Sequence, residues 1–415
     1  MTSDNSNRIL SWNTHALLTR PALRTLRSPL LETNAPVITL EDFLSVVART
    51  VQVIITWYWN LLAAKAGNAG PRSHPPLEIT THQAFFEALR LNPVHRIEYV
   101  TVIGQEDVSS GTGHDPSRLG PPGSAYVPTD IGSVVSPTEI LCTYADEPDW
   151  GMDQALFLRE DYGYGPLPFG TDTGTSSQAP FHMAFYYENP VLFRLHPQLR
   201  KSFMEERIRL FFALGQLAFA HEIDYWGWRF TAWAMHYLQD LTQPYHAKAV
   251  PAPLLRILRR VLVAGGIRNA VEKNKNLLRN RHTLFEASVH FMLNDAFKRY
   301  STHPLLLALT GDGEARAGTI RSVMHESAAV AVGLARSTDE TVMSLISDPR
   351  MVDPEYDLAQ DAAYRIDEAL LAAARDQPEL FERLTRLVCR CFRETGMITR
   401  FSVRRMEFMP APTLP

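Results

Sequence analysis

Apolar residues recur at intervals of three and four along most of the chain, a spacing typical of helices that bury one face. The sequence Thr39-Leu-Glu-Asp has the form of a helix N-cap followed by acidic residues, so a helix is predicted from there to about residue 64. A shorter helix is predicted over 82–91. Further helices are predicted over 203–219, 225–241, 281–297, 317–334 and 361–392. No alternating pattern longer than five residues indicates a strand, and we therefore expect an all-α fold.

Residues 92–180 interrupt this periodicity. Pro and Gly cluster there, in GPPGSAYVP and YGYGPLPFG, and Ser and Thr are frequent. An irregular segment of this length inside a compact chain is usually functional or disordered, and the acids and aromatics of TYADEPDWGMD favour a functional loop. We interpret 1–415 as a single helical domain with a long irregular insertion, in which 300–415 is a helical C-terminal extension.

The composition is that of a folded globular protein, with 45% apolar and 21% charged residues in 415. The 45 acidic residues outnumber the 41 Lys and Arg, which argues against a dedicated nucleic-acid binder. The three cysteines cannot supply a disulfide framework. The fold is therefore expected to depend on its core or on metal.

Neither a signal peptide nor a membrane span is predicted. The first residues, MTSDNSNRIL, are polar, and the longest apolar run, 51–64, is too short to cross a bilayer. We expect either a cytoplasmic protein or one exported by a route that needs no signal peptide.

Histidines and acidic residues lie at spacings that suit a metal site. His236 and Asp240 are four residues apart on one face of a predicted helix, and Pro244 is expected to end that helix and bring His246 beside them. His282 and Glu286 repeat the spacing. Imidazole and carboxylate ligands suit Zn²⁺, although the spacing alone is also typical of salt bridges on a helix surface. No GxGxxG, GxxxxGK[ST], GxSxG or HExxH motif offers a competing site.

The ordered string HYLQDLTQPYH is more specific, because it resembles the signature of the zinc-dependent phospholipase C family, which includes clostridial alpha-toxin. The single-strand-specific fungal zinc nucleases share the fold of that family. The positions that match are His236, Tyr237, Asp240, Pro244 and His246. Gln239 replaces a small residue of the signature, and Val250 stands where the signature has Asn.

The resemblance implies a full set of ligands for two to three zinc ions. One ion would be held by Asp149, His182, His236 and Asp240. A second would be held by His246, His282 and Glu286. A third would be held by Trp12, His15 and Asp240. In DEPDWGMD, Asp146 and Asp153 are alternatives to Asp149, and the family assigns to Asp149 the further role of accepting a proton from the attacking water.

Trp12 departs from the family in one respect. The family Trp is the first residue of the mature protein, and its free amine and carbonyl bind metal, whereas eleven residues precede Trp12 here. Either processing exposes Trp12, or the third ion binds without an amine, or the third site is weak. A core aromatic is the alternative interpretation of Trp12.

The activity implied by the resemblance is hydrolysis of phospholipids such as phosphatidylcholine to diacylglycerol and a phosphorylated headgroup. The first alternative is cleavage of single-stranded nucleic acid, and the second is a non-catalytic helical protein stabilised by zinc. Glu286 favours lipid, because the phospholipases end with H-x-x-x-E and the nucleases typically with H-x-x-x-D. We expect a phospholipid substrate and no nucleic-acid partner.

Residues 248–281 combine many Lys and Arg with apolar residues and contain a single acid, Glu272. This composition is typical of a helix that lies on a membrane surface. An ordinary core-packed helix with solvated arginines is the alternative. We expect the segment to contact a peripheral membrane surface near the mouth of the site.

Overall fold

The computed structural model describes residues 14–66, 79–102, 126–156, 175–251, 267–298, 302–361 and 363–408, together with 159, 162, 164 and 168–170. The α-helices are α2 Thr14–Leu23, α3 Leu40–Ala66, α4 His82–Ala88, α6 Pro137–Tyr144, α7 Ala179–His182, α8 Pro190–Leu195, α9 Met204–Ala220, α10 Asp224–Asp240, α11 Pro244–Ala247, α13 Ile267–Lys298, α14 Pro304–Thr310, α15 Ile320–Leu345, α16 Ile366–Asp376 and α17 Pro378–Phe408. Helices thus dominate the described residues, and the expected all-α fold is confirmed.

Strands are confined to two short antiparallel pairs within the described residues. Strand β1 (Ala35–Pro36) pairs with β4 (Val134–Val135), and β2 (Val100–Val102) pairs with β3 (Tyr126–Pro128). Both pairs involve the region that the sequence marks as irregular. The β1–β4 pair joins that region to the N-terminal part of the chain, whereas the β2–β3 pair lies wholly within it.

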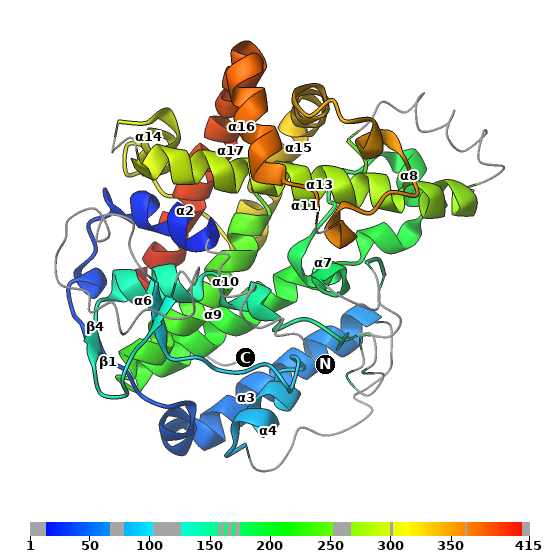
Figure 1. Ribbon diagram of the computed structural model, residues 1–415. Coiled ribbons are helices and arrows are strands. Elements are labelled where there is room, and N and C mark those ends of the chain that lie inside the picture. Colours follow the sequence, from blue (N-terminus) through cyan, green and yellow to red (C-terminus); the bar gives the residue numbers. More distant parts are fainter. Residues whose placement is uncertain are drawn as a thin grey trace.

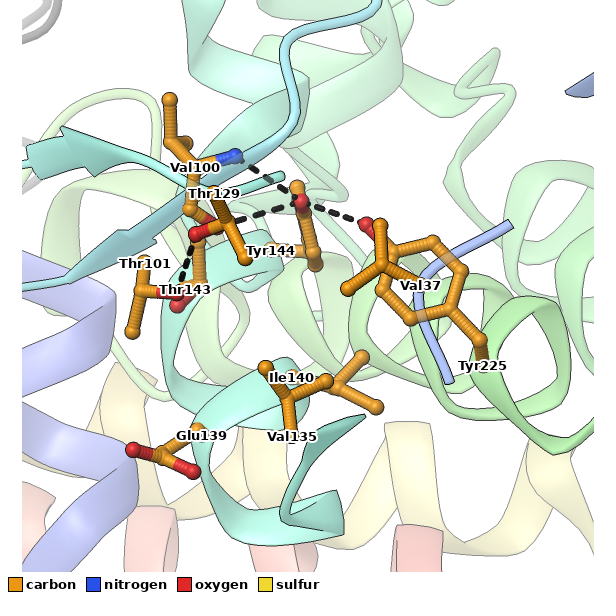
Figure 2. A pocket seen from close by; sticks show the side chains of 10 residues that line it. All are labelled: Val37, Val100, Thr101, Thr129, Val135, Glu139, Ile140, Thr143, Tyr144 and Tyr225. Carbon is orange, nitrogen blue, oxygen red and sulfur yellow. Dashed lines mark hydrogen bonds between the residues drawn. The ribbon is translucent and has the colours of Figure 1, made fainter. Parts of the chain in front are cut away.

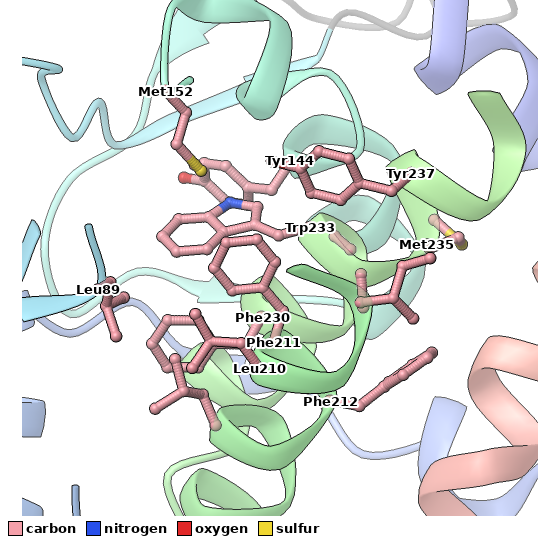
Figure 3. Close-up of a cluster of buried hydrophobic side chains, with 14 of the residues drawn as sticks. Leu89, Tyr144, Met152, Leu210, Phe211, Phe212, Phe230, Trp233, Met235 and Tyr237 are labelled. Carbon is pink, nitrogen blue, oxygen red and sulfur yellow. The ribbon is translucent and has the colours of Figure 1, made fainter. Parts of the chain in front are cut away.

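Helix α10 lies near the centre of the molecule, where it packs against α6, α9 and α17 (Figure 1). Its residues from Tyr225 to Asp240 are all buried, which is the pattern of a helix enclosed on every side. Figure 3 shows how Phe211 of α9 and Phe230 and Trp233 of α10 interlock in the largest core cluster. The candidate ligands His236 and Asp240, at the end of α10, are therefore held by a fully packed helix.

Several element boundaries differ from the sequence predictions. Helix α10 ends at Asp240, one residue before its predicted end, and Pro244 opens the short helix α11. Helix α13 begins at Ile267 rather than at 281, and α15 extends to Leu345 rather than to 334. Helix α6 lies inside the supposedly irregular region, with a capping box formed by Ser136 and Glu139. The predicted helix 361–392 is two helices, because the first ends at Asp376 and Pro378 begins the second.

The C-terminal extension is part of the same body as the rest of the chain. Helix α17 packs against α2, α10, α14 and α15. Arg400 Nη1 donates hydrogen bonds to the carbonyls of Ala22, at 2.9 Å, and Leu309, at 3.0 Å. A helix from the far end of the sequence thus holds α2, which carries the first of the expected ligands.

Within the described ranges, no helix combines the length and the apolar character needed to cross a bilayer.

Candidate metal centre

Helix α2 presents His15 from its first turn. The main-chain nitrogens of His15 and Ala16 donate to the carboxylate of Asp146, at 2.8 and 3.1 Å, and the hydroxyl of Tyr126 donates to the same carboxylate at 2.7 Å. An acidic group is favourable there because the first amides of a helix have no partner inside it. Asp146 therefore anchors α2, and its oxygens are engaged by these three donors.

The first donor group lies between the 3₁₀ turn Glu147–Trp150, the end of α7 and the last turn of α10. His182 Nδ1 lies 2.9 Å from Asp240 Oδ2 and 3.0 Å from His236 Nε2. His236 Nε2 lies 3.2 Å from Asp240 Oδ2. Asp149 Oδ1 lies 3.6 Å from His182 Nδ1 and 3.7 Å from His236 Nε2. Four residues from three separate segments of the chain thus direct their donor atoms at one point.

The second donor group shares Asp240 with the first. The other oxygen of Asp240, Oδ1, lies 3.6 Å from His15 Nε2. Asp149 contributes again, since its Oδ2 lies 3.7 Å from the same nitrogen. The rings of His15 and His236 are close, with centroids 4.1 Å apart. Asp240 therefore faces both groups, one oxygen to each.

The third donor group joins α11 to α13. His246 Nε2 and His282 Nε2 lie 3.0 Å apart, and Glu286 Oε1 lies 3.0 Å from His282 Nε2 and 3.6 Å from His246 Nε2. On its other side, His246 Nδ1 lies 3.2 Å from Asp240 Oδ1. The i, i+4 pair of α13 thus meets the histidine that follows Pro244, in the grouping that the family resemblance implies.

One buried carboxylate supports both segments of the third group. Asp339, on α15, accepts a hydrogen bond from the hydroxyl of Tyr245 at 3.0 Å and forms an ion pair with Arg281 at 3.0 Å. Tyr245 and Arg281 each directly precede a ligand histidine of this group. Asp339 therefore fixes the spacing of α11 and α13.

Two of the histidines also have an oxygen facing their outer nitrogen. His236 Nδ1 donates to the carbonyl of Ala145 at 2.7 Å, so in the neutral ring Nε2 keeps the lone pair and faces inward. His182 Nε2 faces Asp153 Oδ2 at 3.5 Å. Metal-binding imidazoles usually have such an acceptor behind them, because it fixes the ring and its tautomer. These two rings therefore have the acceptors that a metal ligand would need.

Two buried ion pairs secure the loop that carries Asp149. Arg229 of α10 binds Glu147, whose Oε2 also accepts from Trp233 Nε1 at 2.6 Å. Arg207 of α9 binds Asp153 through Nε at 2.9 Å. The four acids of this loop therefore have separate roles, and of the three alternatives it is Asp149 that faces the donor groups.

The donor atoms fit zinc in type and in spacing. Together the three groups contain five imidazoles and three carboxylates, and the ligand atoms of each group lie within 4.8 Å of one another. Tetrahedral zinc at about 2.0–2.1 Å from its ligands separates neighbouring ligand atoms by roughly 3.3 Å. The contacts in the first and third groups run from 2.9 to 3.7 Å, on either side of this value.

Burial and the neighbouring charges shift the pKa values of the histidines in opposite directions. Burial disfavours the charged form of His182, but the carboxylates of Asp153 and Asp240 outweigh it and raise its pKa to about 10. Burial also opposes the charge of Asp240, yet the adjacent histidines, His236 foremost, hold its pKa well below the usual range. Burial, reinforced by His236, lowers the pKa of His15 to about 4. Metal binding must therefore displace protons from some of these ligands.

One side of the centre is open to solvent. The side chains of Glu286, Asp149 and His282 are 36, 27 and 19% exposed, whereas those of the other five ligands are almost completely buried. A substrate would therefore approach past these three residues. The pocket drawn in Figure 2, between β2, β4, α6 and the start of α10, is a different feature. Its volume of about 10 Å³ suits a single water molecule, and none of the ligands lines it.

Two sequence predictions fall partly or wholly outside the described residues. Trp12 lies outside them, and so do 252–266 and the side chains of 267–274, which form most of the basic segment. At the edges of that segment, basic residues pair within the fold. Lys248 binds Glu188 at 2.8 Å, and Arg279 binds Asp357 at 2.5 Å.

Comparison of the chain with protein-family models, curated proteins and solved structures finds no match.

Proposed function

We propose that this chain is a zinc-dependent phosphodiester hydrolase of the phospholipase C type, which releases diacylglycerol and a phosphorylated headgroup. The observation that carries the proposal is the shared carboxylate of Asp240, which faces two donor groups at once and lies 3.2 Å from a histidine of the third. A purely structural zinc site is usually closed by four ligands of its own. A connected cluster with one open side is instead typical of catalysis on phosphate esters.

Clustered zinc ions lower the pKa of a bound water toward neutrality and offset the negative charge that builds up on the phosphoryl oxygens. The protein would contribute the remaining steps. Asp149 lies on the open side with its carboxylate directed at two of the donor groups, so it is placed to accept a proton from the attacking water. Asp240 and the buried histidines hold the ions, and the ion-paired loop keeps Asp149 in position.

The charge of the loaded site suits an anionic substrate. Three divalent ions would carry six positive charges, against three carboxylates and neutral imidazoles. The excess of positive charge favours a phosphodiester over a neutral ester. Glu286, in place of the Asp typical of the nucleases, favours phospholipid over single-stranded nucleic acid. The membrane-surface role of 248–281 remains a prediction from its sequence.

The test uses zinc-loaded protein and two substrates. We expect release of phosphocholine from phosphatidylcholine, and loss of this release when a chelator removes zinc. Single-stranded DNA should remain intact under the same conditions. Degradation of DNA with untouched lipid would establish the nuclease alternative, and zinc binding without hydrolysis of either would establish a non-catalytic zinc protein.

A second experiment separates Asp149 from its neighbours in the loop. Asp149→Asn should lower the rate of hydrolysis by at least 100-fold, because general-base catalysis contributes about 10²–10⁴-fold. Asp146→Asn is the matched control, since that carboxylate binds the amides of α2 instead. Equal losses of turnover in the two variants at full zinc loading would contradict the role of Asp149.

A further inference from the structure

Gln239 occupies the signature position where the zinc-dependent phospholipases have a small residue. Its side chain is buried between α2, α10 and α17. The carboxamide oxygen lies 2.9 Å from His15 Nδ1, and the carboxamide nitrogen donates to the hydroxyls of Thr19 and Thr399 at 3.0 and 2.9 Å. Gln239 thus connects a proposed ligand on α2 with the last long helix of the chain.

Thr399 determines which way the carboxamide of Gln239 faces. The hydroxyl of Thr399 donates to the main-chain carbonyl of Thr395, 2.8 Å away in the preceding turn of α17. A hydroxyl has one hydrogen, so towards Gln239 the oxygen of Thr399 can only accept. The carboxamide nitrogen must therefore face α17, and the carboxamide oxygen must face His15.

This orientation also determines the tautomer of His15. The carboxamide oxygen carries no hydrogen, so Nδ1 of His15 must be the donor. A neutral imidazole that is protonated at Nδ1 keeps its lone pair at Nε2. Nε2 is the nitrogen that faces Asp240 Oδ1 at 3.6 Å and Asp149 Oδ2 at 3.7 Å.

We propose that Gln239 is a positioning residue for the metal centre. It holds His15 as the Nδ1–H tautomer and so makes Nε2 the ligand of the ion shared with Asp240. The series of hydrogen bonds begins at the main-chain carbonyl of Thr395 in α17 and continues through Thr399 and Gln239 to His15. This inference rests on the proposed zinc centre, and it makes the C-terminal helix a functional part of that centre.

The first test titrates metal-free protein with zinc by calorimetry. His15→Ala identifies the binding step that belongs to the ion at His15. Gln239→Leu should weaken that step by about 10–100-fold and leave the other steps unchanged, as is typical when an acceptor behind a metal-bound histidine is lost. Thr399→Val should weaken the same step, whereas Thr399→Ser keeps the hydroxyl and should bind as wild type does.

Gln243 provides the matched control. It is likewise a glutamine beside a proposed ligand, although only partly buried, and its Nε2 donates to Glu286 Oε1 at 3.0 Å, in the third donor group. Gln243→Leu should affect the step that belongs to His246 and His282, and not the step at His15. A merely structural loss in Gln239→Leu would lower the melting temperature of the metal-free protein and leave all zinc affinities equal to those of wild type.

The second test needs no metal. It records the NMR signals of the histidine ring nitrogens in ¹⁵N-labelled metal-free protein. The signals of His15 are identified by their loss in His15→Ala. They should show a protonated Nδ1 in wild type and a mixture of tautomers in Gln239→Leu. An unchanged zinc affinity at the His15 step, or an unchanged tautomer, in Gln239→Leu would overturn the inference and leave the proposed function standing. A wild-type protein that binds no zinc would overturn both.

Discussion

At the scale of single residues, partners decide the role of chemically similar groups. Asp146 and Asp149 are three residues apart in one short loop. Asp146 accepts from two main-chain amides and a tyrosine, whereas Asp149 directs both oxygens at histidines. Asp153 in turn binds Arg207 and faces the outer nitrogen of His182. Their chemistry is the same, and only the surrounding atoms distinguish them.

Asp240→Asn should remove more than one zinc ion from the protein. Each oxygen of Asp240 faces a different donor group, and an amide nitrogen cannot act as a ligand in place of a carboxylate oxygen. Metal analysis of the purified variant measures the loss. His282→Ala, at the edge of the third group, should lose a single ion. Loss of only one ion from Asp240→Asn would contradict a shared carboxylate.

Arg207→Met should lower the free energy of unfolding by about 3–5 kcal/mol. The guanidinium is fully buried against Asp153, and its removal leaves that carboxylate buried without its cation. Urea unfolding of the metal-free protein measures the change. Arg336→Met, which breaks an exposed i, i+4 pair with Glu340, should change it by less than about 1 kcal/mol. Equal effects in the two variants would contradict the buried pair.

At the scale of elements, the close packing of α17 against its neighbours sets the position of Thr399 beside Gln239. At Gly396 this helix meets α14 so closely that an added Cβ would lie 2.2 Å from the carbonyl oxygen of Leu309. Three residues further along is Thr399, which contacts Gln239. A glycine in the middle of a helix thus sets how near α17 approaches its neighbours.

Gly396→Ala should therefore destabilise the protein by roughly 1–3 kcal/mol, the usual cost of overpacking. Gly333→Ala is the matched control. It also lies within a long helix, α15, but an added Cβ there meets no atom within 4 Å. That change should stabilise the protein by up to about 1 kcal/mol, since Ala is the better helix former. Thermal unfolding of the two variants measures both effects, and shifts of the same sign would contradict this packing.

At the scale of the whole molecule, the proposed ligands come from α2, a 3₁₀ turn, α7, α10, α11 and α13. These elements extend over most of the described chain. Because the ions would bind the folded arrangement only, their binding energy adds to the stability of the whole molecule.

Removal of zinc should therefore lower the melting temperature. An ion present at 100 times its dissociation constant adds about 2.7 kcal/mol to the free energy of unfolding. Differential scanning calorimetry with and without a chelator measures the shift, which added zinc should reverse. An identical melting temperature in both conditions would show that the donor groups hold no ion in the native protein.

The sequence predicted the all-α fold and the long central helices, and its resemblance to the phospholipases implied which residues form the donor groups. Helical periodicity marks α9 and α10, and the i, i+4 spacing of His282 and Glu286 places both on one face. The capping box of Ser136 and Glu139 was also readable, and it would have revealed α6. Zinc itself and the activity remain predictions.

The sequence could not predict contacts between residues that lie far apart along the chain. The choice of Asp149 over its neighbours depends on Arg207 and Tyr126, which lie outside the loop and reach it only in the folded chain. The role of Gln239 depends on Thr399, 160 positions away. Sequence spacing describes neighbours on one helix, and these contacts join helices that no local pattern relates.

The contacts between α2 and α17 also have a consequence for biosynthesis. Ala22 and Arg400 are 378 positions apart, so His15 is synthesised long before the helix that secures its surroundings. Loop closure over such a separation is slow. While Thr399 is still inside the ribosome, the nascent chain already contains the residues of all three donor groups. It lacks the hydrogen bond from Gln239 to Thr399, which fixes the orientation of Gln239 beside His15. On the proposals above, the centre matures only after Thr399 has left the ribosome, long after the residues of the three donor groups.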